Sequence, residues 1–309
     1  MTASIATHYY SIFLSLGICV GIGSGCLFVP SVAIVAQYFT TRRSAATGIV
    51  ATGGSIGGIV FPIAFRKLTS ELGWAWANRV LGFIVLATLL LPLSVMKPRV
   101  QPARRRAMFD FSAFKESAFL LFSGGLFLVF VGLYIPFFFM PTFAQLEIRA
   151  NANLSFYLVA ILNAGSFFGR LIPNILADKL GAWQVLLPVT LMTSVFGFIW
   201  IAIKDTPGVI ALAIFYGFFS GAVISIPPSA LVVISPNLAV VGTRMGMSFS
   251  LAGLGLLIGS PAGGAIIQTG AGFAGVAGFT GATIFGGFAL FVLAWLSHKR
   301  KSANAASSV

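Results

Sequence analysis

Nine apolar stretches follow one another along the chain, and short polar or charged segments separate them. Each stretch can cross about 30 Å of hydrocarbon as a helix, which takes roughly 20 residues. The pattern therefore predicts an all-α, polytopic membrane protein with nine transmembrane helices. We expect these helices at about residues 8–38, 44–66, 79–97, 117–145, 154–177, 182–203, 208–235, 243–268 and 273–297.

A polar stripe runs through the fifth stretch. Its members, Asn163, Ser166, Arg170 and Asn174, are three or four positions apart and share one face of a helix. Arg170 lies eight residues before Asp178, which places it about 12 Å inside its helix. A charge at this depth costs roughly 2.5–3.5 kcal/mol and usually faces a cavity. We expect the stripe to line a solute pathway; a structural contact, or a side chain reaching back to the membrane surface, is the alternative.

The composition supports a lipid-embedded chain. Mean hydropathy is +1.00, and only 8% of residues are charged, against about 25% in soluble domains. The net charge is +13, but the basic residues fall in short connections and form no patch on a soluble surface. We therefore expect membrane lipid, and no nucleic acid, as the surroundings of this chain.

The distribution of lysine and arginine predicts an orientation. Fourteen of the 19 basic residues fall on the side that holds the C-terminal residues 299–309, which makes that side cytoplasmic. We expect an integral, multi-pass protein of the plasma membrane, with an organelle membrane as the alternative.

The longest connection, at residues 98–116, divides the chain into two units. It carries the run Arg104-Arg105-Arg106 and is predicted to be a solvated cytoplasmic linker. Contact of this run with anionic headgroups is the alternative. Residues 1–97 would form a partial N-terminal bundle, and residues 117–298 a C-terminal bundle of six helices.

A weak internal repeat relates the first stretch to the seventh and the second to the eighth. Transporters built from two parallel halves show such symmetry. In the second half of the chain, three stretches between about 117 and 203 precede the seventh, so three counterparts, about 80 residues, are expected ahead of the first. The repeat predicts helices four to twelve of a twelve-helix transporter, truncated at the N-terminus. The matched residues are Gly21, Ser24 and Gly25 with Gly217, Ser220 and Gly221, and Arg43, Ala51, Gly54 and Gly58 with Arg244, Ala252, Gly255 and Gly259.

Glycines recur at every fourth position in three stretches, and each series makes a flat surface on which another helix can pack. The series serves static packing, or a contact that slides during alternating access. The packing candidates are Gly21, Gly25, Gly54, Gly58, Gly255 and Gly259.

The segment from Tyr38-Phe39 through the basic pair Arg42-Arg43 to Gly48 resembles the cytoplasmic signature of monocarboxylate transporters in the major facilitator superfamily. The segments 21–31 and 134–138 resemble the fungal branch of that family. The resemblance implies the superfamily fold and secondary active transport of small organic anions, monocarboxylates with a proton, by alternating access. It implies no cofactor.

A second motif, from Gly169-Arg170 to Asp178-Lys179-Leu180-Gly181, is similar to the second-half cytoplasmic loop motif of the superfamily. Asp178 could hydrogen-bond a helix N-terminus and lock one conformation; a plain solvated turn is the alternative. The motif departs from the family pattern, because Asn174 replaces a glycine.

Arg170 matches the arginine that, in this family, is thought to hold the substrate carboxylate. A guanidinium offers a planar fork that suits this role. The expected substrate site comprises Arg170, Asn163, Ser166 and Tyr134. Animal relatives carry an acidic residue where this chain has Ser166, so proton coupling is less well supported than the substrate class.

The inventory of reactive side chains argues against other functions. The six acidic residues lie in connections or at helix ends, and none accompanies His8 or His298, so we expect neither an enzyme nor a metal site. A truncated form that does not transport, and a transporter for another small organic solute, stay as alternatives.

Overall fold

The computed structural model describes residues 2–6, 8–97 and 110–307, and within them it is helical without strands. This confirms the all-α fold. The α-helices are α1 (Tyr9–Ile12), α2 (Val20–Tyr38), α3 (Arg43–Val95), α4 (Ser117–Leu133), α5 (Ile135–Leu146), α6 (Ala152–Leu180), α7 (Ala182–Ile199), α8 (Thr206–Ser225), α9 (Pro227–Ile234), α10 (Leu238–Ile267) and α11 (Gly272–Ser307).

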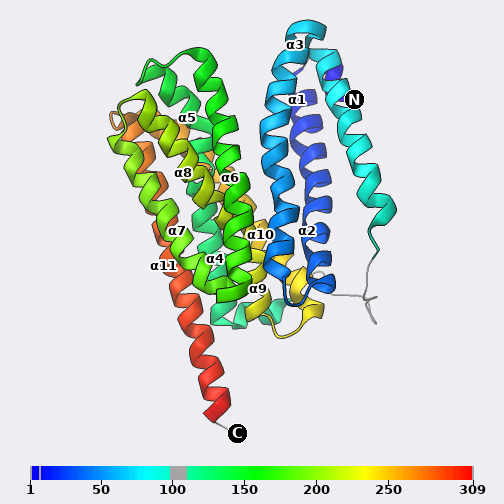
Figure 1. Cartoon of the computed structure of the whole chain (residues 1–309), viewed down its shortest axis with the longest axis vertical. Coiled ribbons are helices and arrows are strands. Elements are labelled where there is room, and N and C mark those ends of the chain that lie inside the picture. The colour runs from blue at the N-terminus through cyan, green and yellow to red at the C-terminus, as the bar shows by residue number, and fades with distance from the viewer. Residues whose placement is uncertain (1, 7, 98–109, 308–309) are drawn as a thin grey trace.

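Eight helices of the described part of the chain are long and apolar enough to cross a membrane. The difference from the nine predicted spans lies in α3, whose 53 residues include a non-helical Gly73 with φ 75° and ψ 171°. This positive φ suits glycine, which has no Cβ to clash. The chain folds back there, so α3 forms two limbs that run in opposite directions, with α1 and α2 between them in the view of Figure 1. These limbs are the second and third predicted spans.

Two other spans are interrupted near their middle. The fourth changes from α4 to α5 at Tyr134, one residue before Ile135-Pro136, and the seventh changes from α8 to α9 at Ile226. Proline lacks an N–H and clashes with the preceding turn, which explains both breaks. The first span contains a π-helical stretch, Phe13–Cys19, between α1 and α2.

The structure describes only part of the segments that were predicted between and after the bundles. Residues 98–109, including the run of three arginines, lie outside the described residues. The rest of the linker forms a short 3-10 helix, Phe111–Lys115. At the C-terminal end, α11 continues as helix to Ser307 and projects beyond the bundle (Figure 1).

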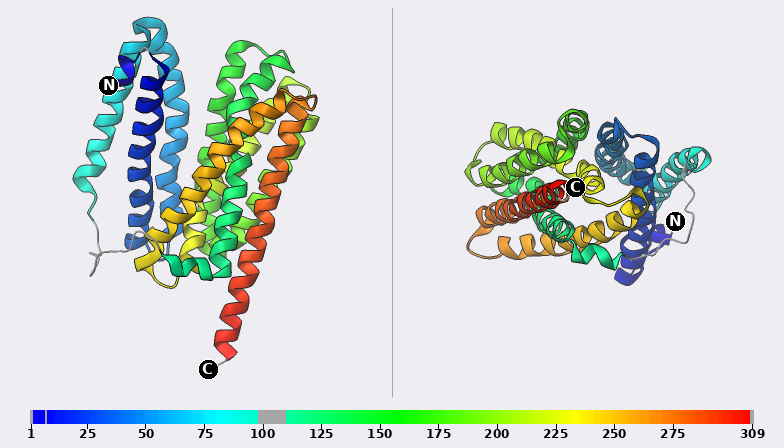
Figure 2. Two further views of the ribbon diagram at one scale, coloured as in Figure 1. Left: turned by 180° about the vertical axis from the view of Figure 1, so that it is seen from behind. Right: turned by 90° about the horizontal axis from the view of Figure 1, so that it is seen from below.

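The helices form two groups that face each other through α3 and α6 (Figure 1). Helix α10 crosses behind the molecule to reach α2 (Figure 2), where the rings of Phe28 and Phe249 meet edge to face at 5.3 Å. We call the end that carries Arg43, Asp178 and Arg244 the basic end, and the opposite end the Gly73 end.

Packing is dense in the group formed by α4–α11. Its centre contains the rings of Phe122, Trp183 and Phe291, which lie within 6.5 Å of one another. Helices α6 and α8 approach so closely that a Cβ on Gly169 would lie 1.8 Å from the carbonyl oxygen of Phe218. The group formed by α1–α3 is different, because its most apolar windows contain no buried residue.

Candidate functional site

Arg170 projects from α6 toward the first limb of α3. Its Nη1 donates a hydrogen bond to the carbonyl oxygen of Ala51, and its Nε is buried without a hydrogen-bond partner. The guanidinium lies against α3 so closely that a Cβ on Gly54 would come within 2.6 Å of Nη1, and the Arg170 side chain would have to shift. The charge therefore lies between the two helix groups and keeps one unsatisfied donor.

A cavity of about 680 Å³ opens beside this guanidinium. It brings together three of the four predicted substrate residues, Arg170, Asn163 and Tyr134. A volume of this size is typical of small-molecule sites. The remaining lining residues are Phe28, Gly54, Gly58, Pro62, Phe137, Phe138, Pro141, Phe156, Val159 and Ile224.

The walls of the cavity differ in character. The α3 wall is smooth, because Gly54, Gly58 and Pro62 follow one another at every fourth position. The α6 wall extends from Phe156 to Arg170, which is about 21 Å of helix. Aromatic rings from α5 and α6 cover most of the rest. The cavity is thus long and apolar, with its cation at the end nearer the basic end.

Ser166 differs from the expectation. It is fully buried and is not a lining residue, because it faces α8, where a Cβ on Gly221 would lie 2.7 Å from its Oγ. Asn174 is also buried; its Nδ2 donates to the carbonyl of Arg170 and, at 2.7 Å, to Oγ of Ser225. The lower part of the stripe therefore joins α6 to the break between α8 and α9.

Asp178 joins α6 to the N-terminus of α3 at the basic end. Its two carboxylate oxygens accept hydrogen bonds from the N–H groups of Ser44 at 2.8 Å and Ala45 at 2.9 Å. The first N–H groups of a helix have no partner within the helix, and the helix dipole favours a carboxylate there. The carboxylate therefore caps a helix of the other group.

The other residues of the predicted basic-end motifs donate to backbone carbonyls of their own helix group or are exposed. The Tyr38 hydroxyl donates to the carbonyl of Lys97 at 2.7 Å, and Nε of Arg43 donates to the carbonyl of Phe39 at 3.2 Å. Arg42 and Lys179 are exposed.

Helices α3 and α6 also meet near the Gly73 end. Nη2 of Arg66 donates to Oδ1 of Asn153 at 2.8 Å, and its guanidinium lies 4.5 Å from the ring centre of Phe156. Because Phe156 lines the cavity, this cation–π contact lies at the aromatic end of the cavity. The two helix groups are thus joined above and below the cavity.

An ion cluster lies at the basic end around Arg244, a residue that the sequence marks only as a match in the internal repeat. Arg244 is 1% exposed and binds Asp110 at 2.9 Å and Glu116 at 2.7 Å. Hydrogen bonds from Ser112 and Arg244 lower the pKa of Asp110, and those from Arg244 lower the pKa of Glu116. The last part of the linker, residues 110–116, is thereby fastened to α10.

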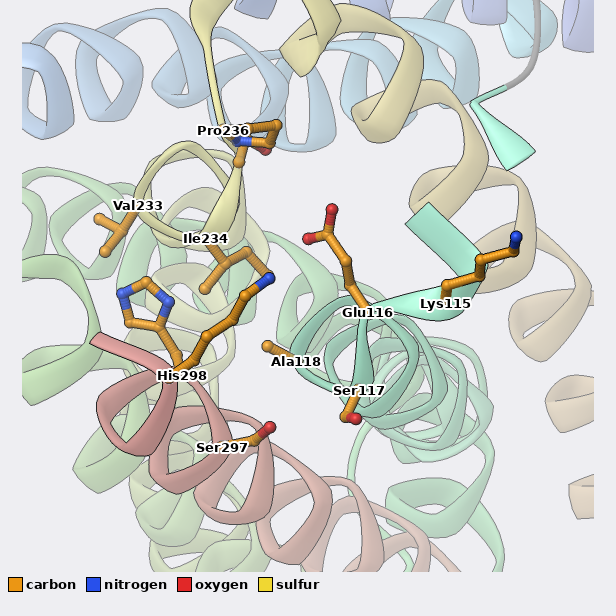
Figure 3. A pocket seen from close by; sticks show the side chains of 11 residues that line it. Lys115, Glu116, Ser117, Ala118, Val233, Ile234, Pro236, Ser297 and His298 are labelled. Carbon is orange, nitrogen blue, oxygen red and sulfur yellow. The ribbon is translucent and has the colours of Figure 1, made fainter. Parts of the chain in front are cut away.

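A second pocket, of about 600 Å³, lies beside this cluster between α4, the end of α9 and α11 (Figure 3). Glu116 and His298 face it from opposite sides, while Lys115 points away from them. Both signs of charge meet there, in contrast to the Arg170 cavity, whose described lining residues include no carboxylate.

The predicted packing glycines fall into two sets. Gly54 and Gly58 face α6, while Gly255 and Gly259 face α4, where a Cβ would lie 2.4 and 1.9 Å from backbone oxygens. At Gly21 and Gly25 a Cβ would meet nothing within 4 Å, so these two contact no helix in the described part of the chain. Among the described residues, no group of three or more potential metal ligands gathers.

The arrangement of helices around a central cavity is accompanied by a match to a known family. The model of the Major Facilitator Superfamily matches residues 1–237. The chain belongs to the major facilitator superfamily. It is therefore an integral, multi-pass membrane protein. The monocarboxylate branch and the missing helices stay predictions.

Its similar relatives are fungal members of the superfamily. The chain is 40% identical over 296 residues to the MFS-type transporter dbaD of Emericella nidulans, covering 96% of this chain and 66% of the relative. It is 38% identical over 293 residues to the aspyridones efflux protein apdF of the same organism, covering 94% and 60%. The fujikurins efflux protein of Gibberella fujikuroi is 37% identical over 271 residues, at 87% and 58%. The chain spans about two thirds or less of the length of these relatives.

Solved superfamily structures share the fold. The human organic anion transporter MFSD10 superposes with a TM-score of 0.74 at 15% identity, covering 94% of this chain and 73% of that one. FucP in its outward conformation gives 0.73 at 15% identity, covering 94% and 78%. These relatives and neighbours are transporters, which agrees with a function other than catalysis.

Proposed function

We propose that this chain forms the solute pathway of a secondary transporter that moves organic anions by alternating access, with Arg170 binding the anionic group. The observation that carries the proposal is the unpartnered Nε of Arg170 beside a cavity between the two helix groups. A buried donor without a partner is costly, so a ligand that accepts from it is favoured. A carboxylate suits a guanidinium because its two oxygens match two N–H groups.

The substrate is a carboxylate on an extended apolar skeleton rather than a very small monocarboxylate. The lining residues include four phenylalanines and two prolines. Asn163 and the Tyr134 hydroxyl supply hydrogen-bonding groups near the cation. An apolar ligand body displaces water from such walls, whereas a two- or three-carbon acid would leave most of the cavity empty.

The direction of transport is export. Two of the similar relatives are named efflux proteins, one for aspyridones and one for fujikurins. We place the basic end and the C-terminus in the cytoplasm, in keeping with the excess of basic residues there. The contact of Asp178 with the N-terminus of α3 would then close the pathway on the cytoplasmic side.

A proton accompanies the anion in this proposal. If one proton moves with one monoanion, the carried charge is zero, and membrane voltage, worth about 2.3 kcal/mol per charge per 100 mV, supplies no driving force. A pH step of one unit supplies about 1.4 kcal/mol. Transport that follows an imposed potential at fixed pH would contradict coupled, neutral movement while leaving the anion site standing.

The test uses the full chain reconstituted in liposomes with a panel of labelled carboxylic acids, from acetate and lactate to larger aromatic acids. We expect transport of the larger acids and its loss in Arg170→Gln. Lys179→Gln is the matched control, because Lys179 is an exposed cation on the same helix. Binding of each acid and its methyl ester, followed by thermal shift, isolates the anionic group. Equal transport by wild type and Arg170→Gln would remove the proposed anion site.

A second candidate is a form that binds solute without moving it. It is favoured by the helices of the α1–α3 group, whose most apolar windows contain no buried residue and which leave that side of the cavity thinly covered. In the same experiment this form would show thermal shifts that depend on Arg170, with no transport by the wild-type chain.

A further inference from the structure

The wall of the Arg170 cavity includes a helix break. Tyr134 occupies it, with φ −91° and ψ −8°, and Pro136 follows two residues later. A proline removes one backbone donor from the helix, so carbonyl groups near the break lose their usual partners. In the hydrocarbon region such groups must be satisfied by another part of the protein.

Tyr216 of α8 satisfies one of these groups. Its hydroxyl donates a hydrogen bond of 2.9 Å to the carbonyl oxygen of Leu133, the last residue of α4. The side chain is 1% exposed, and its ring meets that of Phe137 on α5 at 6.4 Å, close to edge on. One buried side chain thus touches both helices that meet at the break.

The break determines how the cavity is lined. Tyr134 and Phe137 are lining residues and Tyr216 is not. The Tyr134 ring lies between those of Phe130 and Phe137, at 5.9 and 5.6 Å. A change in the angle between α4 and α5 would therefore rotate Tyr134 relative to Arg170.

We propose that Tyr216 is a positioning residue for the Arg170 cavity: by binding the Leu133 carbonyl, it fixes the α4–α5 break and with it the orientation of Tyr134. The role is indirect, because Tyr216 acts through the break and does not touch the solute. The inference rests on the proposed function for its transport readout, and on geometry alone for its labelling readout.

The matched control is Ser194. Its hydroxyl is buried and donates to the carbonyl of Gly281 at 2.8 Å, in a contact between α7 and α11 that borders no lining residue of the cavity. Tyr216→Phe and Ser194→Ala each remove one buried hydroxyl that donates a hydrogen bond to a backbone carbonyl of another helix. We expect similar losses of thermal stability from both.

A transport assay distinguishes a positioning role of Tyr216 from a role in stability alone. We expect Tyr216→Phe to raise the KM for a transported acid by about fivefold, the factor to which one ordinary hydrogen bond corresponds. Ser194→Ala should leave KM unchanged. In a Tyr134→Phe background the effect of Tyr216→Phe should shrink, because the two residues then act on one step. An unchanged KM in Tyr216→Phe, or an equal rise in Ser194→Ala, would overturn the inference.

A labelling measurement decides the matter even if the chain transports nothing, in which case the proposed function fails by itself. Tyr134→Cys is introduced after Cys19 and Cys26, both exposed, are replaced by serine. Tyr216→Phe should change the rate at which a soluble maleimide labels position 134 by about twofold or more, as expected when a fixed side chain gains a second orientation. Ser194→Ala should not change it. Equal rates in all three proteins would show that Tyr216 does not position the wall.

Discussion

Gly54 of α3 lies directly against the guanidinium of Arg170, so that a β-carbon at position 54 would come within 2.6 Å of Nη1. The neighbouring Gly53 has nothing within 4 Å of the same added atom. One glycine therefore makes room for the only cation in the described lining of the cavity, while the other faces open space. This pair allows a substitution to be compared with a control that differs by one position.

Gly54→Ala should displace Arg170 and reduce transport of the acid about tenfold or more, because small misplacements at a binding group have large effects. Gly53→Ala should retain wild-type transport, since it adds the same methyl group to the same helix where space is free. The measurement is initial rate in proteoliposomes at equal protein content. Similar rates in both variants would mean that the position of Arg170 does not limit transport.

Asp178→Ala should open the basic end. The carboxylate on α6 caps α3, and loss of a helix cap costs about 1 kcal/mol, which corresponds to roughly fivefold in an equilibrium. The N–H donors of α3 and the carboxylate acceptor on α6 belong to different helix groups. Loss of these hydrogen bonds therefore destabilises the conformation in which the two groups are in contact at the basic end. Labelling of Thr47→Cys, a buried position one turn into α3, should therefore accelerate by roughly that factor.

Asp205→Ala is the control for this prediction. Asp205 accepts from the N–H of Gly208 at 3.2 Å and caps α8, so both partners lie in the same helix group. We expect a similar loss of stability without faster labelling at position 47. Equal acceleration in both variants would indicate general loosening of the protein.

Arg244→Gln should lower the free energy of unfolding by about 3 kcal/mol, the low end for a broken buried ion pair. The low end applies because Asp110 and Glu116 are 15% and 25% exposed and regain some hydration. Arg300→Gln, at an exposed position, should change stability by less than about 0.5 kcal/mol. Chemical unfolding in detergent measures both, and equal stability of the two variants would contradict a structural role for the cluster.

The part of the site that could be predicted from the sequence is the part fixed by helical periodicity and by the cost of burying charge. Phe156, Asn163 and Arg170 are seven residues apart, two turns of α6, and all three line the cavity. The depth of Arg170 within an apolar span was enough to place it at a cavity. Ser166 was placed wrongly because the polar stripe is wider than the cavity wall and its other edge faces α8.

The remaining features depend on contacts between segments far apart in the chain. Arg244 lies 134 residues from Asp110 and 128 from Glu116, and no local pattern distinguishes it from the exposed Arg42. No sequence pattern distinguishes Tyr216 within its apolar span. Its hydrogen bond to Leu133 is explained only by the helix break at Tyr134. The fold itself could be predicted more fully, because Gly73 separates two apolar runs that are each long enough to cross the membrane as a helix.

Acidification should weaken the protein through the Arg244 cluster. Asp110 and Glu116 have pKa values lowered in the folded state from 3.8 and 4.5, so the folded protein holds these protons less tightly than the unfolded chain. Stability from the two carboxylates is therefore fully present above their unfolded values and is lost as the pH falls through the lower folded values. We expect the melting temperature of the wild-type chain to fall below about pH 5. The double variant Asp110→Asn, Glu116→Gln should start lower at neutral pH and change less over the same interval. Parallel curves for the two proteins would mean that other carboxylates set the acid limit.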